Sequence, residues 1–313
     1  MSTANYKTND RKTGLDETPT AELHPHNFPS ALVQVDLAAE SHRGHVRATN
    51  EDHYLAVRMS RSLETVLSNV AEVLLPKGFD ETAYGLLVAD GMGGMAAGEV
   101  ASNIALLKLL ELVAQTPDWI MKMNKRENAA VVMRRMTTRF RQIDEELRTQ
   151  GESHRSFYGM GTTLTVAASL GTDLFLSHLG DSRAYLLRGR MLHQLTKDHT
   201  LAQALIDAGI AGPDDTSTKA MKHVLTAALG STGEPTDPQV QRLHLTDKDQ
   251  LLLCTDGLTD MVSNDVIAAV LLDSKSSEAA CQKLVTLALA NGGKDNITVV
   301  LARYSFPQAA REY

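Results

Sequence analysis

The chain has few cysteines, few aromatic residues and no long apolar run. Its 313 residues include two cysteines, Cys254 and Cys281. This number excludes a disulfide scaffold and a zinc site built from paired Cys-x-x-Cys motifs. No stretch approaches the roughly 18 apolar residues of a membrane-spanning helix, and the start of the chain lacks the apolar core of a secretion signal. We therefore expect a cytoplasmic protein that does not associate with a membrane.

An excess of basic residues is also absent. The sequence has 31 Lys and Arg against 38 Asp and Glu, a formal net charge of -7. Proteins that bind nucleic acid usually show the opposite balance or a basic stripe, so we expect no nucleic-acid partner. The 43% of hydrophobic residues is enough for a globular core. Nothing in the composition requires more than a monomer.

The organisation of the chain indicates one large domain between two tails. Residues 1–30 are polar and lack apolar periodicity, which predicts a flexible N-terminal tail. Strand-like and helix-like patterns then follow one another over residues 31–305 with no Pro-, Gly- or Ser-rich linker between them. Residues 306–313 are predicted to form a short C-terminal tail.

Apolar periodicity within the domain predicts both helices and strands. The predicted strands lie at residues 31–37, 54–57, 84–89, 162–170, 173–179, 183–188, 190–195, 251–255 and 297–304. The predicted helices lie at residues 97–115, 128–148, 201–208, 267–272 and 277–290. Two clusters of strands interleaved with pairs of helices predict an α+β fold in which helices cover the sheets.

Acidic residues recur at the ends of these predicted strands. Asp90, Asp181 and Asp256 come directly after apolar strands, whereas Glu51 and Asp295 lie just before others. Each aspartate alone is compatible with a helix cap or a turn. Carboxylates gathered in one place repel one another unless they are protonated or bridged by a cation. Because the chain has no cysteine or histidine cluster, the cation that fits is Mg²⁺ or Mn²⁺.

Six short motifs extend this pattern. They lie at residues 44–52, 88–94, 159–163, 180–183, 254–260 and 293–298. Together, and in this order, they resemble the metal-dependent protein phosphatases of the PP2C (PPM) family in their bacterial form. The resemblance implies an α+β fold, a four-layer αββα sandwich whose central antiparallel β-sandwich is flanked by helices on both faces.

The resemblance also implies a role for individual residues in binding two Mn²⁺ or Mg²⁺ ions. The residue that matches Asp90 bridges the two ions in the family. The residues that match Asp256 and Asp295 are the other ligands of the first ion in the family. Those that match Glu51 and the Gly91 carbonyl are ligands of the second. A water that bridges the metals attacks phosphorus, so the family needs no nucleophilic side chain.

Three further positions receive a role from the resemblance. Arg47 is expected to bind the substrate phosphate and, with Asp90, to form the catalytic pair. Asp181, with Asp256 or Asp260 nearby, matches a third, weaker metal site. Met92 stands where eukaryotic members have a histidine proposed as general acid, so another group must protonate the leaving group.

Two segments need a separate interpretation: one is an addition to the family pattern, and the other is expected to control access to the site. Residues 60–83 are an extra stretch whose apolar residues have helical spacing, which predicts an amphipathic helix that packs on the domain or docks a partner. Residues 202–225 match the mobile flap of the family, and their Gly209, Gly212 and Pro213 are typical of a pliable loop. We expect substrate selection to depend on this flap.

The resemblance implies hydrolysis of phosphoserine and phosphothreonine in proteins, in opposition to Ser/Thr kinases. The expected partners are phosphorylated proteins, including such kinases and their substrates. Two alternatives keep the fold but change the function. One is a catalytically weak pseudoenzyme that binds phosphorylated proteins, and the other is a regulator in a partner-switching cascade. The presence of Glu51, Asp90, Asp256 and Asp295 favours an active enzyme.

Overall fold

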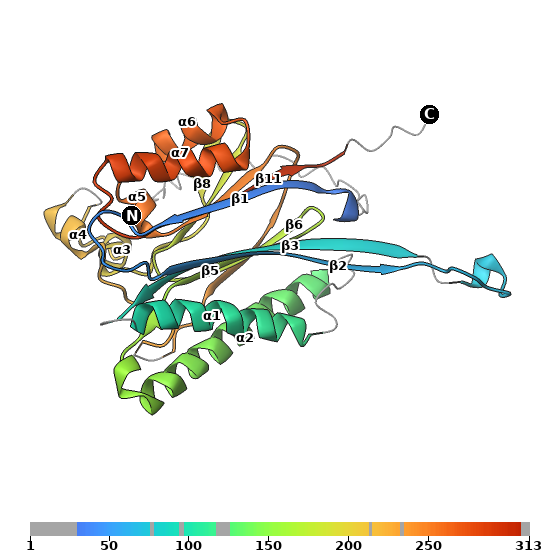
Figure 1. The fold of residues 1–313 in the computed structure, drawn as a ribbon, viewed down its shortest axis with the longest axis horizontal. Helices are drawn as coiled ribbons and strands as arrows, with labels where there is room; N and C mark the ends of the chain where they lie inside the picture. The colour runs from blue at the N-terminus through green and yellow to red at the C-terminus, as the bar shows by residue number, and fades with distance from the viewer. Residues whose placement is uncertain are drawn as a thin grey trace, which may run out of the picture.

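Two antiparallel sheets lie face to face in the computed structural model (Figure 1). The structure describes residues 30–75, 78–93, 97–116, 126–212, 215–231 and 235–307. The first sheet has the order β1 (Gln34–His42), β11 (Ile297–Ser305), β10 (Gln250–Cys254), β7 (Arg183–Arg188) and β8 (Met191–Gln194). The second has the order β2 (Asp52–Leu63), β3 (Phe79–Met92), β5 (Leu164–Leu170), β6 (Asp173–Leu179) and β9 (Gln239–His244). A short strand, β4 (Gly161–Thr162), pairs with the end of β3.

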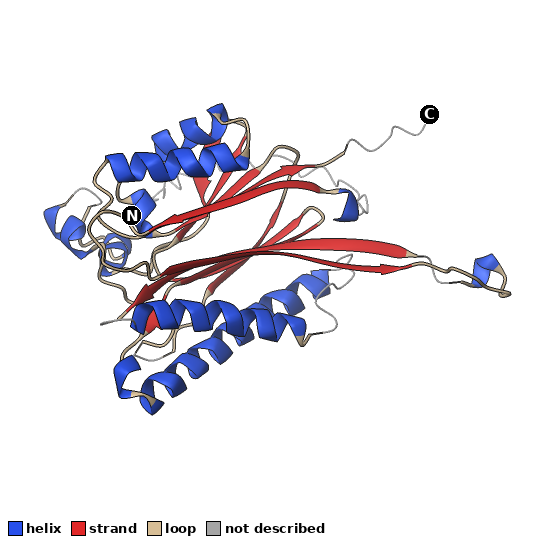
Figure 2. Ribbon diagram, in the orientation of Figure 1, coloured by secondary structure: helices blue, strands red, loops and turns tan. Residues whose placement is uncertain are grey.

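Helices cover the outer face of each sheet, which makes four layers (Figure 2). The second sheet carries α1 (Ala97–Ala114) and α2 (Arg126–Ser153). The first sheet carries α6 (Asn264–Asp273) and α7 (Ser277–Ala290). The expected α+β fold, a four-layer αββα sandwich, is confirmed. No helix within the described ranges is both long enough and apolar enough to cross a membrane.

The central strands show why the sequence forms layers. In β10, Leu251 and Leu253 pack between the two sheets, whereas Leu252 and Cys254 pack against the helices on the outer face. Successive side chains of a strand point to opposite faces, so a strand covered on both sides reads as a continuous apolar run. The predicted strand at residues 251–255 is such a run, and all four side chains are fully buried.

One strand was not predicted from the sequence. β9 is an edge strand whose pattern, QVQRLH, has few apolar residues. Its polar side chains are bonded instead: Gln241 Nε2 donates to the Leu195 carbonyl over 2.7 Å. Arg242 forms an ion pair of 2.6 Å with Asp173 in the neighbouring strand β6. These contacts depend on the fold and leave no apolar period in the sequence.

Each predicted tail includes a residue that belongs to the folded domain, Ser30 at the N-terminal side and Phe306 at the C-terminal side. Ser30 begins a short 3-10 helix, η1 (Ser30–Leu32), and its Oγ accepts a hydrogen bond of 2.9 Å from the Thr82 N–H. Phe306 donates its N–H to Asp247 over 3.0 Å. Both residues therefore belong to the domain. Residues 1–29 and 308–313 lie outside the described part of the chain.

The predicted helix at residues 60–83 is wrong. Strand β2 continues to Leu63 and β3 already begins at Phe79, so this part of the chain is the outer half of a long hairpin. Arg61 pairs across the strands with Glu81 over 2.8 Å, and its guanidinium lies 4.9 Å from the centre of the Phe79 ring. These cross-strand contacts stabilise an extended ladder. Among the described residues of this segment, helical geometry is limited to a single 3-10 turn, η2 (Glu72–Leu74).

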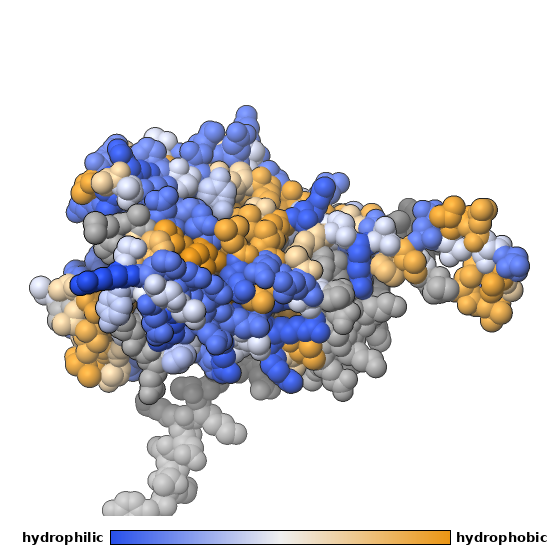
Figure 3. Space-filling model, turned by 60° about the horizontal axis from the view of Figure 1, so that its bottom comes forward, coloured by the Kyte–Doolittle hydropathy of each residue, from blue (hydrophilic) through white to orange (hydrophobic). Residues whose placement is uncertain are grey.

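We call residues 64–75, in the loop between β2 and β3, the arm tip. The tip projects away from the body of the molecule, as Figure 1 shows, and apolar side chains gather on it in Figure 3. Val66, Leu67 and Val73 are 81%, 92% and 89% exposed. Their helical spacing does not lead to a helix because nothing in the described chain covers the apolar face, and an amphipathic helix depends mainly on such packing.

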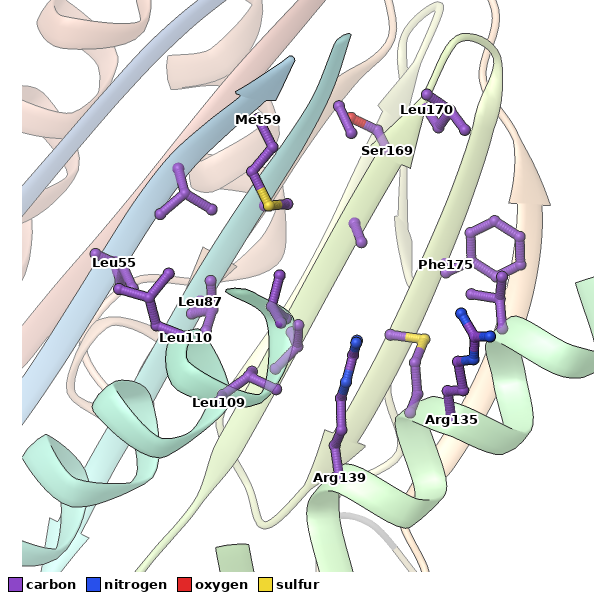
Figure 4. A pocket seen from close by; sticks show the side chains of 18 of the residues that line it. Leu55, Met59, Leu87, Leu109, Leu110, Arg135, Arg139, Ser169, Leu170 and Phe175 are labelled. Carbon is purple, nitrogen blue, oxygen red and sulfur yellow. The ribbon is translucent and has the colours of Figure 1, made fainter. Parts of the chain in front are cut away.

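A small apolar cavity of 110 Å³ lies between the second sheet and helices α1 and α2 (Figure 4). Leu55 and Met59 of β2 line it, together with Leu109 of α1 and Arg139 of α2. Burial in this setting lowers the pKa of Arg139. Since this cavity has no carboxylate lining and shares no lining residue with the acidic cavity described next, it is not the predicted site.

Candidate active site

One polar cavity of 530 Å³ brings together the residues predicted for the site. It lies at the end of the sandwich where β3 ends and β11 begins. All eight predicted site residues line it: Arg47, Glu51, Asp90, Gly91, Asp181, Asp256, Asp260 and Asp295. Residues separated by up to 248 positions therefore share one cavity.

The backbone of Asp90 is held at the end of β3 by three hydrogen bonds. Its N–H donates to Thr163 Oγ1 over 3.0 Å. Its carbonyl accepts from the Thr163 N–H over 2.9 Å and from Thr162 Oγ1 over 2.8 Å. Because these bonds satisfy the backbone groups, the Asp90 carboxylate is left for the cavity.

Two more carboxylates come from one short helix. After strand β10 the chain enters α5 (Asp256–Thr259), and Asp260 follows it directly. The Asp260 N–H donates to the Asp256 carbonyl over 2.8 Å. Residues four apart on a helical turn share a face, which places the Asp256 and Asp260 side chains together.

Glycine is required where Glu51 approaches the start of α1. The Gly91 N–H donates to the Glu51 carbonyl over 3.2 Å. A Cβ on Gly91 would collide with the Gly98 carbonyl oxygen, and one on Gly98 would lie 2.6 Å from Glu51 Oε2. Only residues without a side chain allow the strand, the helix and the carboxylate to come this close.

The carboxylates of the cavity perturb one another. Loss of contact with water raises the pKa of Asp90 well above its usual range, and Asp52, Asp256 and Asp181 raise it further. Burial, followed by repulsion from Asp256, raises the pKa of Asp181 to about 8. Burial also raises the pKa of Asp52, opposite Asp90 in the β2–β3 ladder, to about 7. Such repulsion destabilises the ionised cluster unless a cation is shared.

The residues present fit a hard divalent cation. The donor set consists of carboxylate oxygens and the backbone at Gly91, which Mg²⁺ and Mn²⁺ prefer. Asp256 Oδ1 is buried and has no hydrogen-bond partner in the described part of the chain. A buried carboxylate oxygen without a partner is costly, so this oxygen is a good acceptor for a ligand that enters the cavity.

Arg47 lies at the rim of the cavity, in the loop between β1 and β2. Its Nη2 donates to Asp295 Oδ2 over 2.6 Å, a contact that raises the pKa of the arginine. The Arg47 side chain is 55% exposed. It is therefore fixed at one end of its guanidinium and open to solvent, a geometry suited to an incoming anion.

Two residues of the cavity edge were not predicted. Lys222 and His223 follow α4 (Thr216–Met221) in the segment expected to be a flap. Lys222 Nζ lies 2.7 Å from Asp260 Oδ1. His223 Nε2 lies 3.3 Å from Asp260 Oδ2, and its Nδ1 lies 3.4 Å from Asp256 Oδ2. These partners are more than 30 positions away, so no local spacing pointed to them.

The segment at residues 202–225 contains more helix than a pliable loop would. It holds α4 and most of α3 (Leu201–Asp207), and an isolated bridge joins Thr200 to Leu225. Residues 216–218, predicted as loop, are helical. Pro213 and Asp214 lie outside the described residues. The end of this segment reaches the site, because His223 and Leu225 line the cavity.

Comparison with known proteins decides the family. A model of the family described as protein phosphatase 2C matches residues 78–288, more than half of the chain. The chain belongs to the protein phosphatase 2C family. In this family member, Met92 at the end of β3 lines the cavity beside Asp90 and Gly91.

Two curated relatives are similar over most of the chain. Serine/threonine protein phosphatase PstP of Mycobacterium tuberculosis is 37% identical over 268 residues, which is 85% of this chain and 44% of PstP. The chain thus spans less than half the length of that relative. Serine/threonine phosphatase stp of Listeria monocytogenes is 32% identical over 227 residues, 72% of this chain and 87% of the relative.

Solved structures agree with the fold. The catalytic domain of PstP in complex with two manganese ions is 33% identical, with a TM-score of 0.66, and 87% of this chain aligns with 99% of that domain. The serine/threonine phosphatase of S. agalactiae is 28% identical, with a TM-score of 0.69 and coverage of 86% and 99%.

Proposed function

We propose that this chain is a metal-dependent phosphatase that removes phosphate from phosphoserine and phosphothreonine in proteins. One observation carries the proposal. Carboxylates from both sheets and an exposed arginine converge on one cavity in a chain of the protein phosphatase 2C family. The printed names of its relatives, which are serine/threonine phosphatases, support this substrate class.

The metal-binding roles follow the positions in the cavity. Asp90, Asp256 and Asp295 would hold one ion, and Asp90 with Glu51 and the Gly91 carbonyl would hold a second. Two Mn²⁺ or Mg²⁺ ions in these positions would neutralise phosphate charge and supply an activated water. The manganese ions in the similar PstP structure support this choice of cation. Asp181 and Asp260 remain the proposed ligands of a third ion.

Arg47 is proposed to bind and orient the phosphate. A guanidinium offers a planar fork of donors that matches two phosphate oxygens. Since one end of this fork already donates to Asp295, the carboxylate fixes the guanidinium at the rim before the substrate arrives. The free donors can then align the phosphate for in-line attack, which lowers the entropic cost of the reaction.

We further propose phosphorylated proteins as partners, including Ser/Thr kinases and their substrates, and action as a monomer in the cytoplasm. The two cysteines, Cys254 and Cys281, are unpaired and buried, which suits a reducing compartment. A pseudoenzyme is the less favoured alternative, since it would be expected to have lost one of the carboxylates. A partner-switching role would keep the same chemistry.

Hydrolysis of a phosphothreonine peptide and of p-nitrophenyl phosphate tests the proposal. We expect turnover with Mn²⁺ or Mg²⁺, none with EDTA, and a loss of at least about 100-fold in Asp90→Asn, which removes a charge from the reaction centre. Asp273→Asn, an exposed position at the end of α6, is the matched control and should behave as wild type. A folded wild-type protein without metal-dependent turnover would overturn the phosphatase assignment and favour the pseudoenzyme.

A further inference from the structure

A histidine from the segment after α4 faces two carboxylates of the cavity. One ligand atom each from His223, Asp256 and Asp260 lie within 4.8 Å of one another. The imidazole nitrogens are 3.3 and 3.4 Å from the nearest carboxylate oxygens. Two ligands about 2.1 Å from one ion are roughly 3.0–3.4 Å apart at octahedral or tetrahedral angles. Nε2 faces Asp260 and Nδ1 faces Asp256, and one ion binds only one of these nitrogens, so each nitrogen–carboxylate pair taken by itself has the spacing of two ligands of one ion.

We propose that His223 is a nitrogen ligand of the third metal ion, so that this ion ties the segment after α4 to the cavity. The inference rests on the proposed function and deepens it. The ion would be shared by the imidazole of His223 and the carboxylates of Asp256 and Asp260, with Asp181 beside them.

Two further observations point to a ligand in this place. Asp256 Oδ1 is buried and has no hydrogen-bond partner in the described chain, so the carboxylate of this cluster has an unused acceptor. Asp181, only 8% exposed, lines the same cavity. Both oxygens of Asp260 and Oδ2 of Asp256 face Lys222 or His223, so Asp256 Oδ1 is the acceptor of these two carboxylates that is left for a ligand. This oxygen is buried, whereas a surface ion pair would leave its oxygens in water.

A competing explanation treats His223 as a counter-charge only. The hydrogen bond to Asp256 raises the pKa of His223, and Lys222 already pairs with Asp260 over 2.7 Å. In that case both residues would act as built-in cations that compete with a metal. Removing either one would then strengthen metal binding, because the carboxylates would lose a neutralising partner.

If His223 is a ligand, its removal should change the affinity for the third ion in the opposite direction. Loss of His223 would weaken binding of the third ion, whereas loss of Lys222 would strengthen it. The mixed set of nitrogen and oxygen ligands also predicts a preference for Mn²⁺ over Mg²⁺ at this site, since imidazole suits transition metals and Mg²⁺ prefers oxygen.

Isothermal titration calorimetry of the metal-free full chain with Mn²⁺ tests whether each substitution weakens or strengthens metal binding. The proteins are wild type, His223→Gln, Lys222→Met and His193→Gln, an exposed histidine of β8 that serves as control. We expect the weakest Mn²⁺ site to lose at least about ten-fold in affinity in His223→Gln, since even outer-shell partners cost 10–100-fold. Lys222→Met should bind this ion more tightly, and the control should match wild type. The tighter sites should not change in any variant.

Pulsed EPR of bound Mn²⁺ gives a second readout. Nitrogen coupling should appear in wild type and in His193→Gln, and should be lost in His223→Gln. Unchanged or tighter binding in His223→Gln, or no nitrogen coupling in a wild type that turns over substrate, would overturn the inference and leave the phosphatase intact. A wild type that binds no Mn²⁺ and hydrolyses nothing would instead overturn the proposed function, and this inference with it.

Discussion

At the scale of single residues, Gly180 joins β6 to Asp181 in a left-handed conformation, with φ at +114°. A Cβ at this position would lie 2.5 Å from the Cβ and Cγ2 atoms of Thr163. Thr163 in turn bonds the Asp90 N–H. The absence of a side chain at Gly180 therefore keeps the two acidic strand ends together.

We predict that Gly180→Ala lowers the free energy of unfolding by more than about 3 kcal/mol, because backbone strain and a steric clash add. Gly189→Ala is the matched control. Gly189 also has a positive φ, at +59°, but an added Cβ would meet nothing within 4 Å. This control should lose only about 1–2 kcal/mol. Urea unfolding measures both values, and equal losses would show that the clash with Thr163 has no effect.

His178 should make the protein sensitive to acid. Its ring is fully buried, its Nδ1 lies 2.8 Å from Thr165 Oγ1, and burial lowers its pKa from 6.5 to about 3. Above pH 6.5 the ring is neutral in both states, so its contribution to stability is fully present. As the pH falls from 6.5 toward 3, only the unfolded state gains the proton, and stability is lost.

The expected loss from this one group is up to about 1.4 kcal/mol per pH unit. His178→Asn keeps a polar atom near Nδ1 but cannot titrate, so its stability should fall less steeply below pH 6.5 than that of wild type. The exposed His193→Gln should keep the wild-type slope. Unfolding free energies measured between pH 4 and 7 compare the three proteins, and parallel curves would contradict the prediction.

At the scale of elements, the hairpin of β2 and β3 has an inner part, which packs under α1 and α2, and an outer end, the arm tip. Met59 and Ala83, which pair in the ladder, line the apolar cavity under α1 and α2. The arm tip beyond Leu63 projects from the body, and its large apolar residues are exposed. The free energy of unfolding should therefore depend on the packed part of the hairpin and not on the arm tip.

We predict that replacing the loop of residues 64–78, which contains the arm tip, by an Asn-Gly turn changes the free energy of unfolding by less than about 1 kcal/mol, since the large apolar side chains of the arm tip are exposed. Turnover of p-nitrophenyl phosphate should not change. A deeper truncation that removes Met59 and Ala83 should cost several kcal/mol, because it opens the cavity and removes ladder pairs. Denaturant unfolding distinguishes the two deletions, and a large loss from the first would mean that the tip packs on the domain.

At the scale of the whole molecule, the acidic cavity joins the two sheets. Asp90 lies near the end of β3 in the second sheet, whereas Asp256 follows β10 and Asp295 precedes β11 in the first. Ions shared between them would link the halves of the sandwich. We therefore expect Mn²⁺ at about 100 times its dissociation constant to add about 2.7 kcal/mol of stability for each site.

The metal-free protein should show the reverse effect. In EDTA, Asp90→Asn should unfold at a higher temperature than wild type, because it removes one of the repelling carboxylates. In saturating Mn²⁺ the order should invert. Thermal unfolding in the two buffers measures this, with Asp273→Asn as the neutral control. If Asp90→Asn were the less stable protein in EDTA, repulsion in the cavity would not be a significant cost.

The sequence by itself determined the layers and the acidic cavity. Strands buried on both faces, such as β10, are continuous apolar runs, and the acidic residues lie next to the ends of strands, after some and before others. These signals are local, because they depend on a period or on adjacent residues. They were sufficient to predict sheets covered by helices and a site for a divalent cation. The four-layer sandwich and the roles of the individual site residues were implied by the resemblance of the six motifs to the protein phosphatase 2C family, and the eight residues so predicted line the cavity.

The remaining features were decided by tertiary structure. Residues 60–83 have the apolar spacing of a helix but form the outer half of the β2–β3 hairpin, since no described residue covers that apolar face. β9 is held in the sheet by contacts such as the ion pair of Arg242 with Asp173, and its sequence shows no apolar period. His223 has no acidic neighbour in the sequence, and only the path of the chain after α4 brings it to Asp256 and Asp260. Each feature depends on a partner that is distant in the chain, and such partners leave no local pattern for the sequence to show.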